Sequence, residues 1–313
     1  MAEIEKDTEK SHPYGGGNRN AIAYGLLQGA GYNTAGMSPS EAWELVTQLN
    51  LMESKRWKRT EEDKKEIKEK NKALSTAGKD KKSLEVEAGK YANVVNFGNA
   101  SNIAAIDDAI TTVSDLIKEY SLKKLETMRI KSLSTGTMAS ANEITLNIGD
   151  KITRNPNAAY RICVESYNKN LETTIEDLEK CVANAKNPKA YLRFQASLDN
   201  MKEMNKYSRH NVVYQGEEMK SVITHEMAHV IAGQNFGFAS YGAGNKPLNL
   251  IEKSFKESKQ NGDIYKISAY AAKDADEFWA ECFTMYKMGK EQMPEKIKSM
   301  VEGVLNNHVK KQN

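Results

Sequence analysis

Apolar residues recur at helical spacing over several parts of the chain. The clearest run lies between residues 84 and 120 and consists of Ile103, Ile106, Ile110, Val113 and Ile117. Because residues three and four positions apart share a helix face, this run predicts one amphipathic helix. Similar patterns predict three or four helices over about 155–206, another over 253–259 and a closing amphipathic helix over 292–308.

Alternation of apolar and polar residues is confined to a shorter part of the chain. Residues 142–148 alternate with period two, which predicts a β-strand. More broadly, residues 126–150 indicate two strands around a Ser-Thr-Gly turn. The predicted fold is therefore α+β and mostly helical, with a small sheet beside a buried helix and a helical N-terminal region.

That buried helix is apolar on almost all sides. Its apolar positions are Met219, Val222, Ile223, Met227, Val230 and Ile231. Such a broad apolar surface is typical of a buried helix, and Gly233 together with the Gly-rich run after it is expected to end this helix. The helix also contains His225, Glu226 and His229 in the order His-Glu-x-x-His, and buried histidines need polar partners. The alternative is a surface helix that carries two unrelated histidines.

The spacing of these three polar residues is that of a zinc peptidase. His225 and His229 are four positions apart, so their imidazoles share a helix face and can bind one Zn²⁺. Glu226 lies beside them, where it can take a proton from a water molecule that the zinc activates. A catalytic zinc also needs a third protein ligand, which these residues do not supply.

The third ligand decides the class of peptidase. The metzincin pattern requires a glycine where the chain has Ala232 and a histidine where it has Asn235. The other histidines, which have no supporting pattern, are His12, His210 and His308. A carboxylate is therefore the favoured third ligand.

Two candidate carboxylates lie on a second predicted helix, over residues 274–286, with Asp274 or an immediate neighbour as its N-cap. Glu277 and Glu281 are four positions apart and share a face. Apolar residues surround them, namely Phe278, Trp279, Ala280, Cys282 and Phe283. Carboxylates in such a helix are rarely buried without a positive charge, which zinc and its histidines would supply. The alternative is a solvated acidic stripe on an amphipathic helix.

The same region resembles the second signature of the anthrax lethal-factor-type (ATLF-like) gluzincin zinc metallopeptidases. That signature reads Ser-x-Tyr, a short spacer and then Glu-Phe-aromatic-Ala-Glu-Ala-Phe, and the chain matches it with Ser268, Tyr270, Glu277 and Glu281. The 48 positions from His229 to Glu277 are also close to the family's spacing. Proline-specific clostridial endopeptidases and domains appended to phage head-morphogenesis proteins show a similar pair of signatures. The resemblance covers at most residues 120–310.

This resemblance implies a zincin-like fold and residue roles for hydrolysis of peptide bonds. By position, Glu277 is the third zinc ligand, so that one zinc ion per chain is expected. Tyr270 matches the tyrosine that stabilises the oxyanion or protonates the leaving amine, and Glu281 matches a carboxylate that orients a ligand histidine. Cys282 departs from the family's alanine and is interpreted as a small core residue.

Substrates of such sites bind extended along a sheet edge. The strand over residues 142–148 is the candidate for that edge, although its pattern is equally that of any sheet strand. The predicted partner is thus a protein or peptide substrate, and virion components are further candidates through the phage resemblance.

Composition limits which other binding partners and which cellular compartment are expected. The chain has 313 residues and a net charge of +3, which is too small to indicate a nucleic-acid partner. Three cysteines without metal-type spacing argue against a disulfide framework and favour a reducing compartment. The N-terminus lacks the pattern of a Sec signal peptide, and no stretch approaches the roughly 18 apolar residues of a membrane span. A cytoplasmic or virion-associated location is expected.

Three segments are expected along the chain. They are a flexible arm over 1–19, a helical, charge-rich region or linker over 20–82, and the zincin-like metallopeptidase domain over 83–313. In the second segment, Ser38, Pro39 and Glu41 predict a helix start with a capping box. Charged residues over 55–72 predict a solvated helix or linker. The basic cluster over 55–59 suggests contact with nucleic acid or a membrane as the lesser alternative.

Two functional hypotheses follow from the sequence. The first is an active zinc endopeptidase, and the second is a structural protein, such as a minor capsid component of a phage head, that retains a peptidase-like fold without needing its chemistry. The complete set of residues for metal binding and proton transfer favours the first hypothesis, and a virion-borne peptidase would satisfy both.

Overall fold

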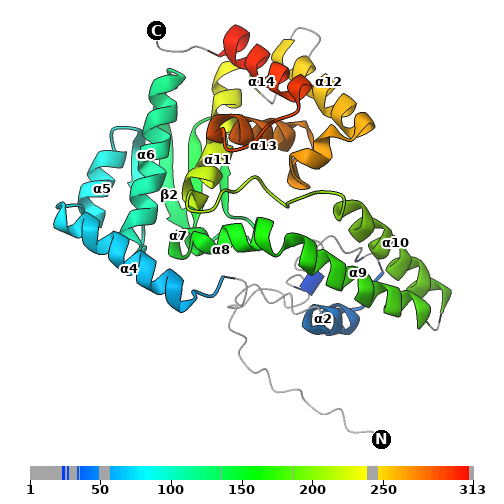
Figure 1. Cartoon of the computed structure of the whole chain (residues 1–313). Helices are drawn as coiled ribbons and strands as arrows, with labels where there is room; N and C mark the ends of the chain where they lie inside the picture. Colours follow the sequence, from blue (N-terminus) through cyan, green and yellow to red (C-terminus); the bar gives the residue numbers. More distant parts are fainter. Residues whose placement is uncertain are drawn as a thin grey trace, which may run out of the picture. The chain divides into compact units, whose positions relative to one another are not determined.

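The computed structural model describes residues 23, 24, 27, 34, 36–48, 57–134, 136–185, 187–237 and 246–309. They form a mostly helical α+β fold with one four-stranded sheet, as the sequence predicts (Figure 1). The chain divides into two compact units, one of Met1–Met52 with Leu178–Asn200 and one of Glu53–Asp177 with Met201–Asn313. The arm expected over residues 1–19 lies outside the described residues.

The smaller unit contains the predicted capping box. Helix α2 (Pro39–Gln48) begins after Ser38, whose backbone N–H donates to Glu41 Oε2 over 2.7 Å. The backbone N–H of Glu41 donates in return to Ser38 Oγ over 3.3 Å. Arg193, on the part of α10 (Pro188–Met204) that belongs to this unit, lies 3.6 Å from Glu41 Oε2. This helix start is therefore confirmed.

The larger unit contains the sheet. Its strands are β1 (Ala92–Asn96), β2 (Leu125–Lys131), β3 (Ala139–Ala141) and β4 (Thr145–Gly149). They lie in the order β1-β2-β4-β3, with β1, β2 and β4 parallel and β3 antiparallel to β4. Helix α6 (Ile103–Glu119) connects β1 to β2, as a parallel pair requires a crossover. The isoleucine run that predicts this helix is confirmed.

The strand expected at the sheet edge is an internal one, and that prediction is wrong. One side of β4 pairs with β2, in the register Met128↔Leu146 and Ile130↔Ile148. On its other side the chain reverses at Asn142, whose side-chain oxygen accepts from the N–H groups of Ile144 and Thr145. This turn places the short strand β3 outside β4. Such a strand is too short for its alternation to be recognised in the sequence.

The rest of the larger unit is mostly helical, and α5, α7 and α11 contact its strands. Before β1 come α4 (Glu61–Thr76) and α5 (Lys81–Ala88), which both contact α6, so this unit begins well before residue 83. After β4 come α7 (Asp150–Arg154), α8 (Asn157–Tyr160), the π-helix η1 (Arg161–Glu165) and α9 (Tyr167–Ala183), whose residues from Leu178 on belong to the smaller unit. The remaining helices are α11 (Glu218–Asn235), α12 (Lys246–Asn261), the 3₁₀ turns η2 (Asp263–Lys266) and η3 (Tyr270–Ala272), α13 (Ala275–Met288) and α14 (Glu295–His308).

The charge-rich segment differs from the solvated helix that its composition predicts. Helix α4 begins after Thr60, which forms a capping box with Asp63. Asp63 is buried, because Arg161 of η1 donates to both of its oxygens over 2.9 and 2.6 Å, and Asn155 adds a third donor at 3.2 Å. Ile67 is buried on the same helix. One face of α4 is thus part of the packed fold, and only the rest of it is solvated.

Helix α11 runs through the middle of the larger unit, where it contacts α6, α13, β3 and β4 (Figure 1). It is buried along most of its length, as its apolar sequence predicts. Gly233 itself does not end the helix, which continues to Asn235, and Gly237 with a φ of 60° follows the C-cap Phe236. A Cβ atom at Gly233 would lie 2.9 Å from Glu143 Cα, so this glycine permits close approach to the β3–β4 turn.

None of the helices in the described residues is long and apolar enough to cross a membrane.

Candidate metal centre

Helix α11 brings the two histidines of the His-Glu-x-x-His motif together. His225 and His229 are one turn apart, and the centroids of their rings are 5.1 Å apart. His225 is 9% exposed, and Glu226 between them is 7% exposed. The helix is therefore the buried element that the sequence predicts, with polar groups aimed at one place.

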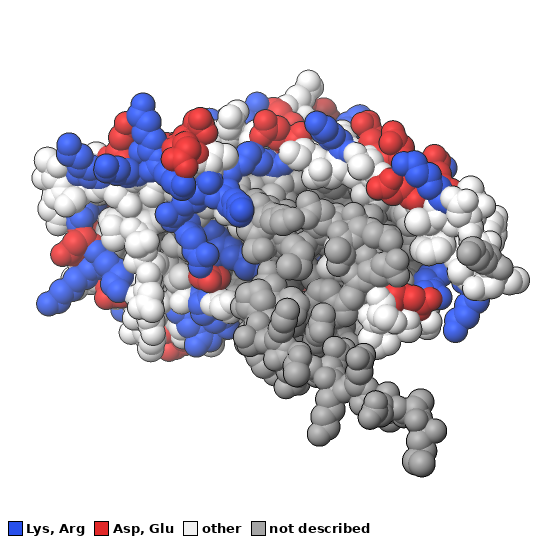
Figure 2. Space-filling view, turned by 90° about the horizontal axis from the view of Figure 1, so that it is seen from below, with Lys and Arg blue, Asp and Glu red and all other residues white. Residues whose placement is uncertain are grey.

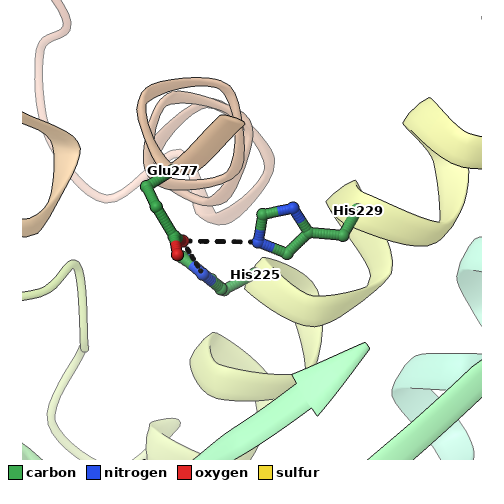
Figure 3. A group of neighbouring side chains, drawn as sticks. All are labelled: His225, His229 and Glu277. Carbon is green, nitrogen blue, oxygen red and sulfur yellow. Dashed lines mark hydrogen bonds and ion pairs between the residues drawn. The ribbon is translucent and has the colours of Figure 1, made fainter. Parts of the chain in front are cut away.

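Helix α13 supplies the carboxylate that faces these imidazoles. Asp274 caps the helix by accepting from the N–H groups of Asp276 and Glu277 over 3.1 and 2.9 Å, which confirms it as the N-cap. Glu277 in this first turn points at α11 (Figure 3). Its Oε2 lies 3.1 Å from His225 Nε2 and 3.4 Å from His229 Nε2.

These three side chains form a group that could hold a metal ion. Each of His225, His229 and Glu277 offers one ligand atom, and the three atoms all lie within 4.8 Å of one another. In the part of the chain that the structure describes, no other group of three histidines, cysteines or carboxylates meets this criterion. The structure thus brings together the three residues that the sequence singles out as metal ligands.

Packing between α11 and α13 fixes the positions of these candidate ligands. Trp279 is fully buried and its indole N–H donates to the backbone oxygen of Ala228 over 3.0 Å. Phe278 and Phe283 are also fully buried. A hydrogen bond from a core tryptophan to the backbone of α11 sets the register between the two helices. The alternative of a solvated acidic stripe on α13 is wrong, because Glu281 is 1% exposed.

The second oxygen of Glu277 has its own donors. The hydroxyl of Tyr270, from the turn η3, donates to Glu277 Oε1 over 2.9 Å. The ammonium group of Lys273 donates to the same oxygen over 2.8 Å and lies 3.5 Å from the Tyr270 hydroxyl. Sequence reasoning missed Lys273, which precedes the N-cap Asp274 and so lies outside α13, where no helical spacing points to its contact with Glu277.

Glu281 lies behind His225, on the far side of its ring from Glu277. Its Oε1 is 2.9 Å from His225 Nδ1, the distance of an ion pair. Its Oε2 accepts from the backbone N–H of Val212 over 2.6 Å and from Ser268 Oγ over 2.7 Å. Asn211 Nδ2 donates to Oε1 over 3.3 Å. Glu281 is therefore outside the group of three candidate ligands and lies beside one of them, His225.

Two of these partners of Glu281 had no signal in the sequence. Asn211 and Val212 belong to a stretch without motif or periodicity, and only the structure places them against α13. Ser268 does stand in the signature that the chain resembles, where its role is not evident from the residues. Its hydroxyl also accepts from the backbone N–H of Ala271, so it ties the turn before η3 to Glu281.

The charges at this site perturb each other. Burial acts to lower the pKa of His225, but the adjoining carboxylates of Glu277 and Glu281 outweigh it and raise that pKa to about 10. Burial acts to raise the pKa of Glu277, whereas hydrogen bonds from His225 and His229 hold it well below its usual range. The two carboxylates beside His225 therefore favour the protonated form of its imidazole.

Glu226 and Tyr270 have pKa values shifted in the direction of their neutral forms. Burial raises the pKa of Glu226, against the opposing effect of His225 and His229, and a hydrogen bond with the backbone of Ala141 lowers it. Glu226 thus lies between the histidines and the edge strand β3. Burial, followed by the charge of Glu277, raises the pKa of Tyr270, so its hydroxyl keeps its proton.

Cys282 does not contribute to the site. It is fully buried on α13, and burial raises the pKa of its thiol well above its ordinary value. A neutral buried thiol behaves as a small apolar residue. The interpretation of Cys282 as a core residue is confirmed.

Comparison of the chain with protein-family models, with curated proteins and with solved structures gives no match. The residues of the site and their geometry are accordingly the basis for assigning a function.

Proposed function

We propose that this chain is a zinc-dependent metalloendopeptidase of the gluzincin class with a zincin-like fold. The observation that carries this proposal is the convergence of His225 Nε2, His229 Nε2 and Glu277 Oε2 on one point. Glu226 lies beside the two imidazoles, and Tyr270 contacts Glu277 from the turn η3. The lethal-factor-type signatures in the sequence assign the same residues to the same roles.

The donor set suits zinc. Two imidazole nitrogens and one carboxylate oxygen are the ligands of many catalytic zinc sites, and three protein ligands leave a coordination position open for a reactant. The arrangement also has the support that such sites need, because a histidine ligand usually pairs its other ring nitrogen with a carboxylate. Glu281 is the carboxylate on that side of the ring, with its Oε1 at an ion-pair distance of 2.9 Å from His225 Nδ1.

When bound, zinc would polarise both a water molecule and the carbonyl group of the substrate. Glu226 accepts one proton from the water while the water oxygen forms a bond to the carbonyl carbon. As the carbon–nitrogen bond breaks, Glu226 returns this proton to the nitrogen, so the products are a carboxylic acid and an amine. The raised pKa of Glu226 makes it a stronger base than an exposed glutamate. The Tyr270 hydroxyl donates a hydrogen bond to the carbonyl oxygen as negative charge develops there.

The substrate binds as an extended peptide along β3. Among the described strands β3 pairs with β4 alone, so its outer side can accept a further strand. The strand contacts α11, and the Ala141 backbone hydrogen-bonds Glu226. A peptide added to this edge therefore passes beside the proposed general base. The edge strand is β3, rather than the strand over 142–148 that the sequence suggested.

Substitution of Glu226 tests this function. The purified wild-type chain is expected to cleave members of a peptide library, and a chelator is expected to stop the cleavage. Glu226→Gln removes the proton acceptor but none of the three ligands, so it should retain zinc and lose at least about 10²-fold in kcat/KM. Glu295→Gln makes the same chemical change at an exposed position on α14 and should leave cleavage unchanged. Cleavage by Glu226→Gln at the wild-type rate would contradict the proposal.

A further inference from the structure

Backbone hydrogen bonds join the segment that carries Asn211 and Val212 to the segment that carries Tyr270. The backbone N–H of Tyr270 donates to the oxygen of His210 over 2.9 Å, and Ala269 donates to Arg209 over 2.9 Å. The backbone N–H of His210 donates in turn to the oxygen of Cys163 in η1 over 2.7 Å. His210 is thus held on both sides and lies next to the proposed tyrosine.

The ring of His210 stacks on the ring of Tyr270. The two centroids are 5.8 Å apart, and the planes are inclined by 28°. Tyr270 also lies against the metal-ligand candidate His225, with 5.8 Å between centroids. Because the hydroxyl of Tyr270 must point at Glu277 and its surroundings, the direction of its ring matters. His210 is one of the two imidazoles that hold this ring.

His210 also reaches Glu281, through one intervening amide. His210 Nδ1 lies 2.5 Å from Asn211 Oδ1, and Asn211 Nδ2 donates to Glu281 Oε1 over 3.3 Å. The same oxygen of Glu281 faces His225 Nδ1 at 2.9 Å. His210, Asn211, Glu281 and His225 therefore form a continuous polar chain that ends at the metal site.

The directions of these hydrogen bonds determine which nitrogen of His210 carries a proton. Glu281 already accepts from the N–H of Val212 and the hydroxyl of Ser268, so it acts as an acceptor. Asn211 must then present its NH₂ group to Glu281 and its oxygen to His210. A carbonyl oxygen only accepts, which requires a proton on Nδ1 of His210. Cys163 Sγ, at 3.7 Å, is the second donor to that Asn211 oxygen.

We propose that His210 is a positioning residue of the metal site, one that orients Tyr270 by stacking and His225 through Asn211 and Glu281. This inference rests on the proposed function. His210 touches neither the three candidate ligands nor Glu226 in the contacts described above, so it acts through other residues. The imidazole of His210 thus contacts Tyr270, the proposed hydrogen-bond donor to the carbonyl oxygen. Through Asn211 it also reaches Glu281, the carboxylate beside the candidate ligand His225.

Two substitutions separate these two effects. His210→Phe keeps an aromatic ring against Tyr270 but removes the Nδ1 donor, which allows the Asn211 amide to turn its oxygen toward Glu281. It should weaken zinc binding about 3- to 10-fold, somewhat less than loss of a direct partner of a ligand histidine. His210→Asn places an amide donor near the position of Nδ1 but removes the ring. It should retain the zinc affinity and lower kcat about 10-fold with little change in KM, because Tyr270 is less well oriented.

The measurements are zinc affinity by competition with a chromogenic chelator, and kcat and KM on a peptide that the wild type cleaves. Thermal melts verify that each variant is folded. His308→Phe and His308→Asn, at the end of α14, are the matched controls and should match the wild type in both measurements. Unchanged zinc affinity in His210→Phe together with unchanged kcat in His210→Asn would overturn the inference alone. A wild type that binds no zinc would overturn the proposed function and this inference with it.

The protonated nitrogen of His210 gives a test that needs no zinc. In the ¹⁵N NMR spectrum of the labelled protein, the signals that disappear in His210→Asn belong to this ring. Nδ1 should have the chemical shift of a protonated nitrogen. An unprotonated Nδ1 would overturn the inference, because Asn211 could not then be held in the orientation described.

Discussion

A glycine-to-alanine substitution at Gly233 tests how closely α11 approaches the edge of the sheet. In most helices this change is stabilising, because alanine has the higher helix propensity by about 1 kcal/mol. At Gly233 the added Cβ would lie 2.9 Å from both Cα and Cβ of Glu143 and 3.3 Å from its backbone nitrogen. The obstacle is mostly backbone, in the turn between β3 and β4, so it cannot be relieved by moving the end of a flexible side chain.

The magnitude follows from these two opposing terms. Insertion of a methyl group into a tightly packed position costs about 1–3 kcal/mol. Subtracting the gain in helix propensity of about 1 kcal/mol leaves a net loss of roughly 1 kcal/mol. Gly303 provides the matched control, since it too is inside a helix, α14. Its added Cβ would lie 3.4 Å from the side-chain carbon Cδ2 of Leu250, an ordinary contact. Gly303→Ala should therefore stabilise the protein by about 0.5–1 kcal/mol.

Chemical denaturation and thermal melts of the two variants and the wild type give the answer. A change of 1 kcal/mol shifts the melting temperature by about 2–4 °C in domains of 150–250 residues. The two variants should thus lie on opposite sides of the wild type. A Gly233→Ala protein as stable as Gly303→Ala would refute the close approach of α11 to the β3–β4 turn, and with it the placement of Glu226 beside β3.

Three further predictions concern the candidate metal ligands and the ion pair between Asp63 and Arg161. Glu277→Ala should lower zinc affinity far more than Glu281→Ala, for which a loss of about 10- to 100-fold is expected, and the reverse order in a chelator competition would exchange their roles. Zinc binding at neutral pH should release about one proton from His225, whose pKa is raised to about 10, so that affinity increases with pH. Calorimetry in buffers of different ionisation enthalpy measures this release, and an affinity independent of pH would contradict it. Burial alone would raise the pKa of Asp63, but Arg161 and its other donors lower it to about 2. A carboxyl whose pKa is lowered on folding stabilises the folded state at pH values above its pKa in the unfolded chain, near 3.9. Asp63→Asn should therefore lower the free energy of unfolding by roughly 1–2 kcal/mol at pH 7, and this difference from the wild type should vanish as the pH falls from about 4 to 2. Urea denaturation in which the two free energies of unfolding do not converge over that range would contradict the prediction.

The sequence identifies the helices and the two candidate histidine ligands because these have local signals. The spacing of Ile103, Ile106 and Ile110 follows the helix repeat, and these residues form part of α6. His225 and His229 are likewise placed on one face by the repeat itself. Glu277 is a different case, since its contact with them depends on the packing of α13 on α11. The resemblance to a known signature, rather than local physics, points to it.

The sequence does not reveal features that depend on contacts between distant segments. Helix propensity predicts an end at Gly233, whereas packing against Glu143 retains this glycine inside the helix. The charge of α4 predicts full solvation, but Arg161, almost a hundred residues later, buries Asp63. His210 and Asn211 lie in a stretch without periodicity, so their hydrogen bonds toward Glu281 follow only from the fold.

The position of a bound zinc ion tests the central claim most directly. Crystals of the zinc-loaded wild-type protein, measured on both sides of the zinc absorption edge, would locate the ion by its anomalous scattering. We expect one peak per chain, bounded by His225 Nε2, His229 Nε2 and a carboxylate oxygen of Glu277, at about 2.0–2.2 Å from each. A peak at any other place, or a fully loaded site in which Glu281 replaces Glu277 as the ligand, would contradict the proposed centre.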